Sequence, residues 1–176
     1  MPLPDLIEIS PLTSPVTAHI TVPGSKSITN RALILAALAE RQTTLTGALW
    51  SEDTQIMVEA LQALGFSVEV GEDASEVSNR TITVCGEGGR IPKMPEEIFV
   101  GNAGTTARFL SALVCLGDGS VRLHGIDRMH ERPQFELFQA LRMLGYQVDA
   151  PDDKLPAVIH GTGSHKASCK VSLSES

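Results

Sequence analysis

The stretch Pro23-Gly24-Ser25-Lys26-Ser27-Ile28-Thr29-Asn30-Arg31, followed at once by the apolar run 32–39, decides how the first part of this chain folds. Proline and glycine end the strand-like residues before them, and the two serines offer side-chain oxygens to the free N–H groups of a starting helix. A helix N-terminus with hydroxyls and a lysine beside it suits an oxyanion such as phosphate or carboxylate. Ser27 and Arg31 stand four residues apart, so they share one helix face and can contact the same ligand. This stretch therefore predicts a helix whose first turn binds a small anion.

The composition is that of a globular, acidic protein. The chain has 176 residues with 42% apolar residues, which is enough for one large domain or two small ones with a real core. Its formal net charge of −7 and its aromatic content of 4% argue against nucleic acid and anionic membranes as partners. A small anion is the better match to the cationic residues near glycine-rich turns, which are Lys26, Arg31, Arg108, Arg128 and Arg132.

The cysteines and histidines do not suggest a metal site. Cys85, Cys115 and Cys169 lie far apart and form no CxxC pair, and the five histidines have no metal-ligand spacing. The first residues carry neither the basic region nor the apolar core of a signal peptide, and the run 32–39 is too short to span a bilayer. We therefore expect a cytoplasmic protein without a metal and without a membrane partner.

The order of predicted elements suggests a repeat. Residues 1–16 contain four prolines and read as an irregular lead-in. Periodicity and turn residues predict strands at 17–22, 43–49, 66–70, 80–85, 121–125, 146–149 and 157–160. They predict helices at about 27–40, 52–64, 107–116 and from Arg132-Pro133 to 145.

Three correspondences support that repeat. The run Ala60–Gly65 matches Ala140–Gly145 at an offset of 80, and Leu45-Thr46-Gly47 matches Leu123-His124-Gly125 at an offset of 78. Arg31 and Arg108, which each lead an apolar helix, lie 77 residues apart. We predict two β-α-β-α-β-β-like units, at 17–90 and 91–165, with 166–176 as the start of a third.

The hydrophobic pattern indicates which layer is buried. The helical runs 32–39 and 109–116 are apolar nearly all round, as in a buried helix. The strands alternate instead, as in Val121-Arg122-Leu123-His124, which is typical of sheets with one wet face. The prediction is an α/β (α+β) fold with helices inside and sheets outside, the reverse of a doubly wound fold.

Three motifs together carry a resemblance to a known family. Residues 24–31 (GSKSITNR), 101–105 (GNAGT) and Glu131-Arg132-Pro133 occur in the order and at the distances found in the N-terminal part of the 5-enolpyruvylshikimate-3-phosphate synthases, the 3-phosphoshikimate 1-carboxyvinyltransferases. The turn Glu52-Asp53-Thr54 fits the same family, and the resemblance extends from about residue 17 onward. Each motif alone is weak, but their joint register is specific.

The resemblance implies a fold and an activity. The family's fold has two halves, each an inside-out, barrel-like arrangement of three β-α-β-α-β-β units with buried helices and outer sheets. Its members transfer the enolpyruvyl group of phosphoenolpyruvate to the 5-hydroxyl of shikimate-3-phosphate, in the shikimate pathway to aromatic amino acids. They need no metal or organic cofactor.

The resemblance also implies roles for individual residues. Lys26 resembles the lysine that touches both substrates, and Ser27 and Arg31 resemble shikimate-3-phosphate ligands. Gly104 and Arg132 resemble phosphoenolpyruvate ligands, because a glycine lets the backbone approach an anion and a guanidinium matches its oxygens. Positions that shape the pocket are matched by Asp53, Asn102 and Thr105, and Asp53 can also orient Lys26 by charge pairing.

The chain departs from the family in length. The second half, with the acidic residue and the lysine assigned to proton transfer, is missing from these 176 residues, so we expect no turnover by this chain alone and either the missing half or a second copy as a partner. Two alternatives stay open: a non-catalytic module that binds a phosphorylated metabolite, and a relative of the transferase that acts on UDP-N-acetylglucosamine. For Arg108 and Arg128, a ligand contact and a structural salt bridge are equally consistent with the sequence.

Overall fold

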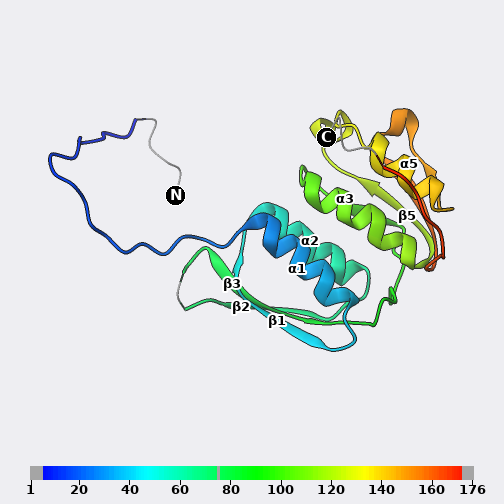
Figure 1. Cartoon of the computed structure of the whole chain (residues 1–176), viewed down its shortest axis with the longest axis horizontal. Helices are drawn as coiled ribbons and strands as arrows, with labels where there is room; N and C mark the ends of the chain where they lie inside the picture. Colours follow the sequence, from blue (N-terminus) through cyan, green and yellow to red (C-terminus); the bar gives the residue numbers. More distant parts are fainter. Residues whose placement is uncertain (1–5, 75, 172–176) are drawn as a thin grey trace.

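Two β-sheets with three helices between them form the body of the molecule in the computed structural model, which describes residues 6–74 and 76–171 (Figure 1). The helices are α1 (Lys26–Leu38), α2 (Glu52–Ala63), α3 (Gly104–Leu113), α4 (Asp127–His130) and α5 (Phe135–Met143), with short 3-10 turns η1 (Val114–Leu116) and η2 (Pro151–Asp153). The strands are β1 (Gln42–Leu49), β2 (Val68–Glu72), β3 (Asn79–Cys85), β4 (Glu97–Phe99), β5 (Asp118–His124), β6 (Gln147–Asp149) and β7 (Ala157–Thr162).

The two sheets differ in topology. The first has the order β1-β3-β2 with both pairs antiparallel. The second has the order β4-β5-β7-β6, in which β4 and β5 run parallel and the other pairs are antiparallel. Helices α1 and α2 cover one face of the first sheet, and α3 lies between them and the second sheet (Figure 1). This agrees with the predicted α/β fold of inner helices and outer sheets.

Local sequence explains where the first two helices begin. The Oγ atom of Ser25 accepts a hydrogen bond from the Ile28 N–H at 3.4 Å and caps α1. At the start of α2, the Thr54 hydroxyl accepts from the Ser51 N–H at 2.9 Å and donates to the Leu49 carbonyl at 2.7 Å. The first bond satisfies an N–H group that the start of α1 leaves free, and the Thr54 bond to Leu49 attaches the start of α2 to the end of β1.

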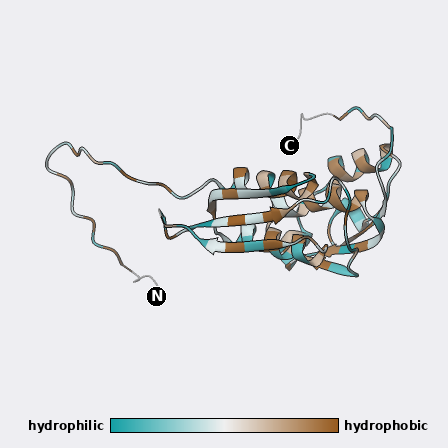
Figure 2. Cartoon of the chain, turned by 90° about the horizontal axis from the view of Figure 1, so that it is seen from below, coloured by the Kyte–Doolittle hydropathy of each residue, from teal (hydrophilic) through white to brown (hydrophobic). Residues whose placement is uncertain are grey.

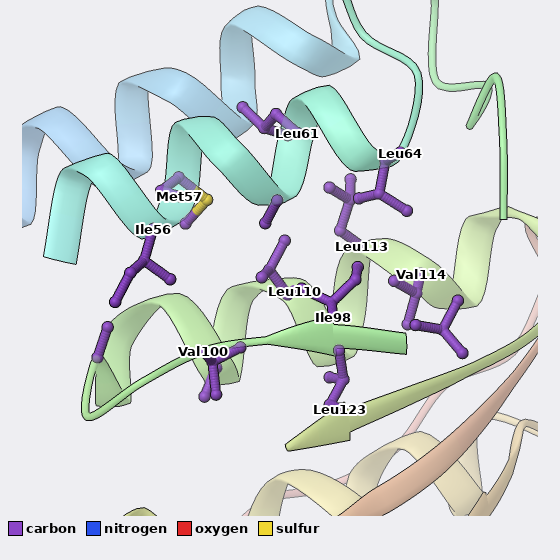
Figure 3. Close-up of a cluster of buried hydrophobic side chains, with 14 of the residues drawn as sticks. Ile56, Met57, Leu61, Leu64, Ile98, Val100, Leu110, Leu113, Val114 and Leu123 are labelled. Carbon is purple, nitrogen blue, oxygen red and sulfur yellow. The ribbon is translucent and has the colours of Figure 1, made fainter. Parts of the chain in front are cut away.

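A single hydrophobic core joins the two sheets. Ile56 and Leu64 of α2 point toward α3 and β4, where they lie near Ile98 and Leu110, and all four side chains are 8% exposed or less (Figure 3). Hydrophobic and hydrophilic residues alternate along the strands, so each sheet buries one face and exposes the other (Figure 2). The helix N-termini are therefore held in fixed positions relative to each other.

Several predicted elements need correction. Residues 17–22 form no strand: they pair with no other described segment, and Ile20 is 81% exposed. Alternation identifies an extended backbone, but a strand also needs a neighbouring edge to exchange hydrogen bonds. The last helix begins at Phe135 rather than at Arg132-Pro133, because the short helix α4 and a turn precede it. The three-residue strand β4 was not predicted, since it is too short for a periodic signal.

Helix α1 is also less buried than predicted. Leu33 and Ala37 are fully buried, but Ile28 is 67% exposed and Leu35 is 68% exposed. One apolar face of α1 therefore lies against the core, and the other is uncovered among the residues that the structure describes. Within those same residues, no helix is long and apolar enough to cross a membrane.

Candidate functional site

A cavity of about 380 Å³ opens where α1, α2 and α3 begin. Lys26 is the first residue of α1, Asp53 the second of α2, and Gly104 the first of α3. The residues that line the cavity are Lys26, Asp53, Asn102, Gly104, Thr105, Arg108, Arg132 and Gln134. Because N–H groups and the positive ends of helix dipoles gather at such starts, this position favours an anion.

The start of α1 is fixed by a close approach of backbones. A Cβ atom on Gly24 would lie 2.2 Å from the Gly47 carbonyl oxygen, so only glycine fits there. The Gly24 N–H donates to Oδ1 of the buried Asn79 at 2.8 Å. One turn further on, the Thr29 hydroxyl accepts from the Leu49 N–H at 3.1 Å. These contacts with the first sheet set the position of Lys26.

Lys26 and Asp53 form an ion pair in the cavity. Lys26 Nζ lies 3.2 Å from Asp53 Oδ2, with the two side chains 47% and 24% exposed. The Asp53 carbonyl accepts from the Thr106 hydroxyl at 3.2 Å, which joins the starts of α2 and α3. The structure thus forms the charge pair that the sequence suggested, and Asp53 holds the ammonium group at the mouth of the cavity.

Arg132 lies over the turn that begins α3. Its Nη1 donates to the Asn102 carbonyl at 3.3 Å and lies 3.9 Å from the Met129 sulfur. A Cβ atom on Gly104 would lie 2.7 Å from Arg132 Nη1. The absent side chain at position 104 therefore leaves room for the guanidinium group beside the first turn of α3.

Arg108 and Gln134 complete the lining. Arg108 Nε donates to Gln134 Oε1 at 3.3 Å, which joins α3 to the segment just before α5. The sequence left Arg108 open between two roles and did not point to Gln134. The signal that could have found Gln134 is its place directly after Glu131-Arg132-Pro133.

Three further predicted residues lie outside the cavity. Ser27 and Arg31 are exposed on α1, where Arg31 Nη1 donates to the Ser27 carbonyl at 3.4 Å. They share a face as predicted, but the structure does not bring them together with the cavity residues. Arg128 is exposed in α4 and does not line the cavity either.

The charge of the cavity is opposite to that of the chain. Three cationic side chains and one carboxylate line it, within a chain whose formal net charge is −7. No group of three or more histidine, cysteine or acidic residues in the described part of the chain could hold a metal ion. The arrangement can bind phosphate or carboxylate oxygens through charge-assisted hydrogen bonds.

Comparison with known proteins gives a consistent result. The family model for EPSP synthase (3-phosphoshikimate 1-carboxyvinyltransferase) matches residues 12–176. A 3-phosphoshikimate 1-carboxyvinyltransferase of Opitutus terrae is 46% identical over the whole chain, which covers 41% of that protein. Another, from Trichormus variabilis, is 42% identical over 89% of the chain and 36% of its own length.

Solved structures agree with the sequences. EPSP synthase from Acinetobacter baumannii superposes with a TM-score of 0.71 at 29% identity, over 81% of this chain and 31% of that one. The chain thus spans about two fifths or less of the length of these relatives. They carry the shikimate-branch name and not that of the transferase acting on UDP-N-acetylglucosamine. By sequence and by fold, this chain belongs to the EPSP synthase family.

Proposed function

We propose that these residues form the part of an enolpyruvyl transferase that holds phosphoenolpyruvate and one side of shikimate-3-phosphate. The observation that carries this proposal is the cavity at the starts of α1, α2 and α3, where Lys26, Arg108 and Arg132 surround a space of about 380 Å³. The relatives named above are called 3-phosphoshikimate 1-carboxyvinyltransferases, so their names give a phosphorylated shikimate as the substrate.

Each group has a role in binding under this proposal. The planar fork of Arg132 binds two oxygens of a carboxylate or phosphate, and Gly104 lets the backbone N–H groups of α3 approach the same anion. Lys26, held by Asp53, supplies a mobile point charge between the two substrates. Asn102 and Thr105 shape the wall beside them.

In the transfer, the 5-hydroxyl of shikimate-3-phosphate loses its proton to a base and its oxygen bonds to C2 of phosphoenolpyruvate, while C3 takes up a proton and the C2–C3 double bond becomes single. The bond from C2 to the phosphate oxygen then breaks and phosphate leaves, while C3 gives up a proton and the C2–C3 double bond forms again. The cationic groups of the cavity stabilise the phosphate and carboxylate charges during both steps, because they are already in position before the reaction. Ser27 and Arg31 extend this binding along α1 toward shikimate-3-phosphate.

The proposal also includes a partner, which would supply a second protein surface facing the cavity. Ile28 and Leu35 are exposed on α1, next to the proposed substrate ligands, which supports either the remainder of the family's fold or a second copy as a partner. A cytoplasmic location is part of the same proposal, supported by the free thiols of Cys85, Cys115 and Cys169.

A titration with phosphoenolpyruvate tests the proposal. We expect Arg132→Lys to weaken binding by about tenfold or more, because an ammonium group cannot replace a two-pronged guanidinium contact. Arg90→Lys is the matched control, since Arg90 is 82% exposed and does not line the cavity. Equal affinities of the wild type and Arg132→Lys would contradict the proposal.

An assay of phosphate release on the same samples separates binding from catalysis. We expect binding without turnover from this chain by itself, since the proton-transfer groups of the family lie in the half that these residues do not include. Turnover would show that the chain, or a self-assembled form of it, supplies those groups.

A further inference from the structure

Gln134 is a buried polar residue that no motif predicted. It is 4% exposed and stands just before α5. Its backbone is held on both sides: the N–H donates to the Asp153 carbonyl at 3.0 Å, and the carbonyl accepts from the Phe138 N–H at 3.0 Å. Its side chain makes no capping bond to α5, so the amide group serves another purpose.

The amide has one possible orientation. Arg108 Nε can only donate, so the Gln134 atom 3.3 Å away must be the oxygen and not the nitrogen. The amide nitrogen, Nε2, then occupies the other position. Nε2 has no protein acceptor among the described residues. It is also not among the fully buried polar side-chain atoms of those residues that lack a partner. Gln134 lines the cavity, so a ligand in that space can supply the acceptor that the amide N–H groups lack.

Arg108 has no carboxylate partner within the described ranges 6–74 and 76–171. It stands four residues after Gly104 in α3, so both lie on the helix face that lines the cavity. Gln134 occupies its Nε, which leaves the two terminal nitrogens of the guanidinium group for a ligand. A free, oriented guanidinium beside a free amide forms a binding edge for oxygen atoms.

An ion pair and a hydrogen bond from Arg142 support the segment behind Gln134. Asp153, which accepts the Gln134 N–H, has a positive φ of 52°, and its neighbour Asp152 has a φ of 53°. Such a conformation is costly for residues other than glycine and persists only where the surroundings enforce it. Arg142 does so, since it binds the Asp153 carboxylate and, at 2.9 Å, the Val148 carbonyl.

We propose that Gln134 and Arg108 form a second anion subsite of the cavity, in which Gln134 is the positioning residue. Its Oε1 holds Arg108 Nε so that the terminal nitrogens face the cavity, and its Nε2 donates to the same phosphate or carboxylate group. This inference rests on the proposed function, because it assigns the site a second contact with its phosphorylated carboxylate substrate.

A double-mutant cycle on the full chain tests the pairing. The variants are Gln134→Met, Arg108→Met and the double variant, each titrated with phosphoenolpyruvate. Gln62→Met is the matched control, because Gln62 is exposed on α2 and does not line the cavity. If Gln134 had only a structural role, Gln134→Met would weaken binding equally in the wild type and in Arg108→Met. If Gln134 positions Arg108, its substitution weakens binding only while Arg108 is present.

We expect each single substitution to weaken binding by about tenfold, the value of a hydrogen bond to a charged group. We expect Gln134→Met to weaken it by less than about threefold once Arg108 is methionine, with the small remainder coming from Nε2. Equal losses from Gln134→Met in both backgrounds, or no loss at all, would overturn the inference.

Gln134→Glu adds a second measurement, which also serves if the methionine variant fails to fold. It keeps an oxygen for Arg108 Nε but places a negative charge beside the anion, so we expect a greater loss than with methionine. Affinity at the wild-type level in Gln134→Glu would also overturn the inference.

The controls distinguish this inference from the proposed function. If the wild type binds and Arg132→Lys weakens binding, but the Gln134 variants bind like the wild type, the subsite is wrong and the proposed function stands. If the wild type does not bind phosphoenolpyruvate, both are wrong.

Discussion

At the scale of the residue, Gly104 links backbone geometry to the proposed anion site. In Gly104→Ala, the new Cβ atom would stand 2.7 Å from Arg132 Nη1, so the guanidinium group has to move. The backbone at position 104 does not have a positive φ, and alanine suits a helix start better than it suits a left-handed turn. We expect weaker binding of phosphoenolpyruvate by severalfold with little change in the melting temperature. A large fall in melting temperature would contradict this assignment.

Cys115 provides a second test at this scale. Burial raises the pKa of its thiol to about 11, and the thiol donates to the Ser111 carbonyl at 3.3 Å. The thiolate is the reactive form, so Cys115 in the folded chain should react with iodoacetamide at pH 8 at least about ten times more slowly than Cys85 or Cys169. Both of those thiols are partly exposed. Mass spectrometry of the labelled peptides measures the rates of the three cysteines at a temperature below the unfolding transition. Equal rates under that condition would contradict the buried position of Cys115.

At the scale of the element, α1 depends on a side chain 55 residues away. The Asn79 side chain accepts from the Gly24 N–H at 2.8 Å, and Asn79 is 5% exposed. In Asn79→Ala, this N–H loses its partner in a part-buried position, at a cost of about 1–3 kcal/mol. We expect a lower free energy of unfolding and weaker anion binding, because the start of α1 carries Lys26.

Urea unfolding and a phosphoenolpyruvate titration measure the two effects. Ser120→Ala is a suitable control, since Ser120 is exposed on β5 of the second sheet, whereas Asn79 lies in the first sheet. Unchanged stability in Asn79→Ala would mean that the Gly24 contact does not fix the helix.

The sequence predicted the helices better than the strands, for a physical reason. Helices α1 and α2 are specified locally, by Ser25 and Thr54 at their starts and by apolar spacing within them. Strands depend on a partner: residues 17–22 alternate correctly but pair with nothing described, and β4 has three residues, too few for a period.

The sequence motifs predicted those residues of the cavity that lie within them. The matched positions Lys26, Asp53, Gly104 and Arg132 line it together with Asn102 and Thr105, although they come from four separate segments. The position of Gln134 directly after Glu131-Arg132-Pro133 was a signal that the prediction did not use. Its contact with Arg108 could not be predicted, because Arg108 lies 26 residues earlier and only the packing of α3 beside the α5 segment brings them together. Ser27 and Arg31 were placed on one helix face, but periodicity does not tell whether that face meets the cavity.

At the scale of the whole molecule, the uncovered face of α1 should promote association. Ile28 and Leu35 lie seven residues apart on this helix and are 67% and 68% exposed. Large apolar side chains gathered on one face favour contact with another protein surface. We expect the sedimentation coefficient to rise with protein concentration and Leu35→Lys to reduce this rise.

Val77→Lys is the control for added charge, because Val77 is 84% exposed in the turn between β2 and β3 and does not belong to α1. An equal effect of both substitutions would point to net charge rather than to the α1 face. A chain that stays monomeric at millimolar concentration would contradict the expectation.

The most direct test of the proposed site is a calorimetric titration with shikimate-3-phosphate, on the wild type, Lys26→Ala and Lys93→Ala. Lys26 pairs with Asp53 in the cavity, whereas Lys93 is exposed and does not line it. We expect the wild type and Lys93→Ala to bind alike, and Lys26→Ala to lose about tenfold or more, because Asp53 is then left unpaired beside the anion. Wild-type affinity in Lys26→Ala, or no binding by the wild type, would contradict the assignment of this cavity as the substrate site.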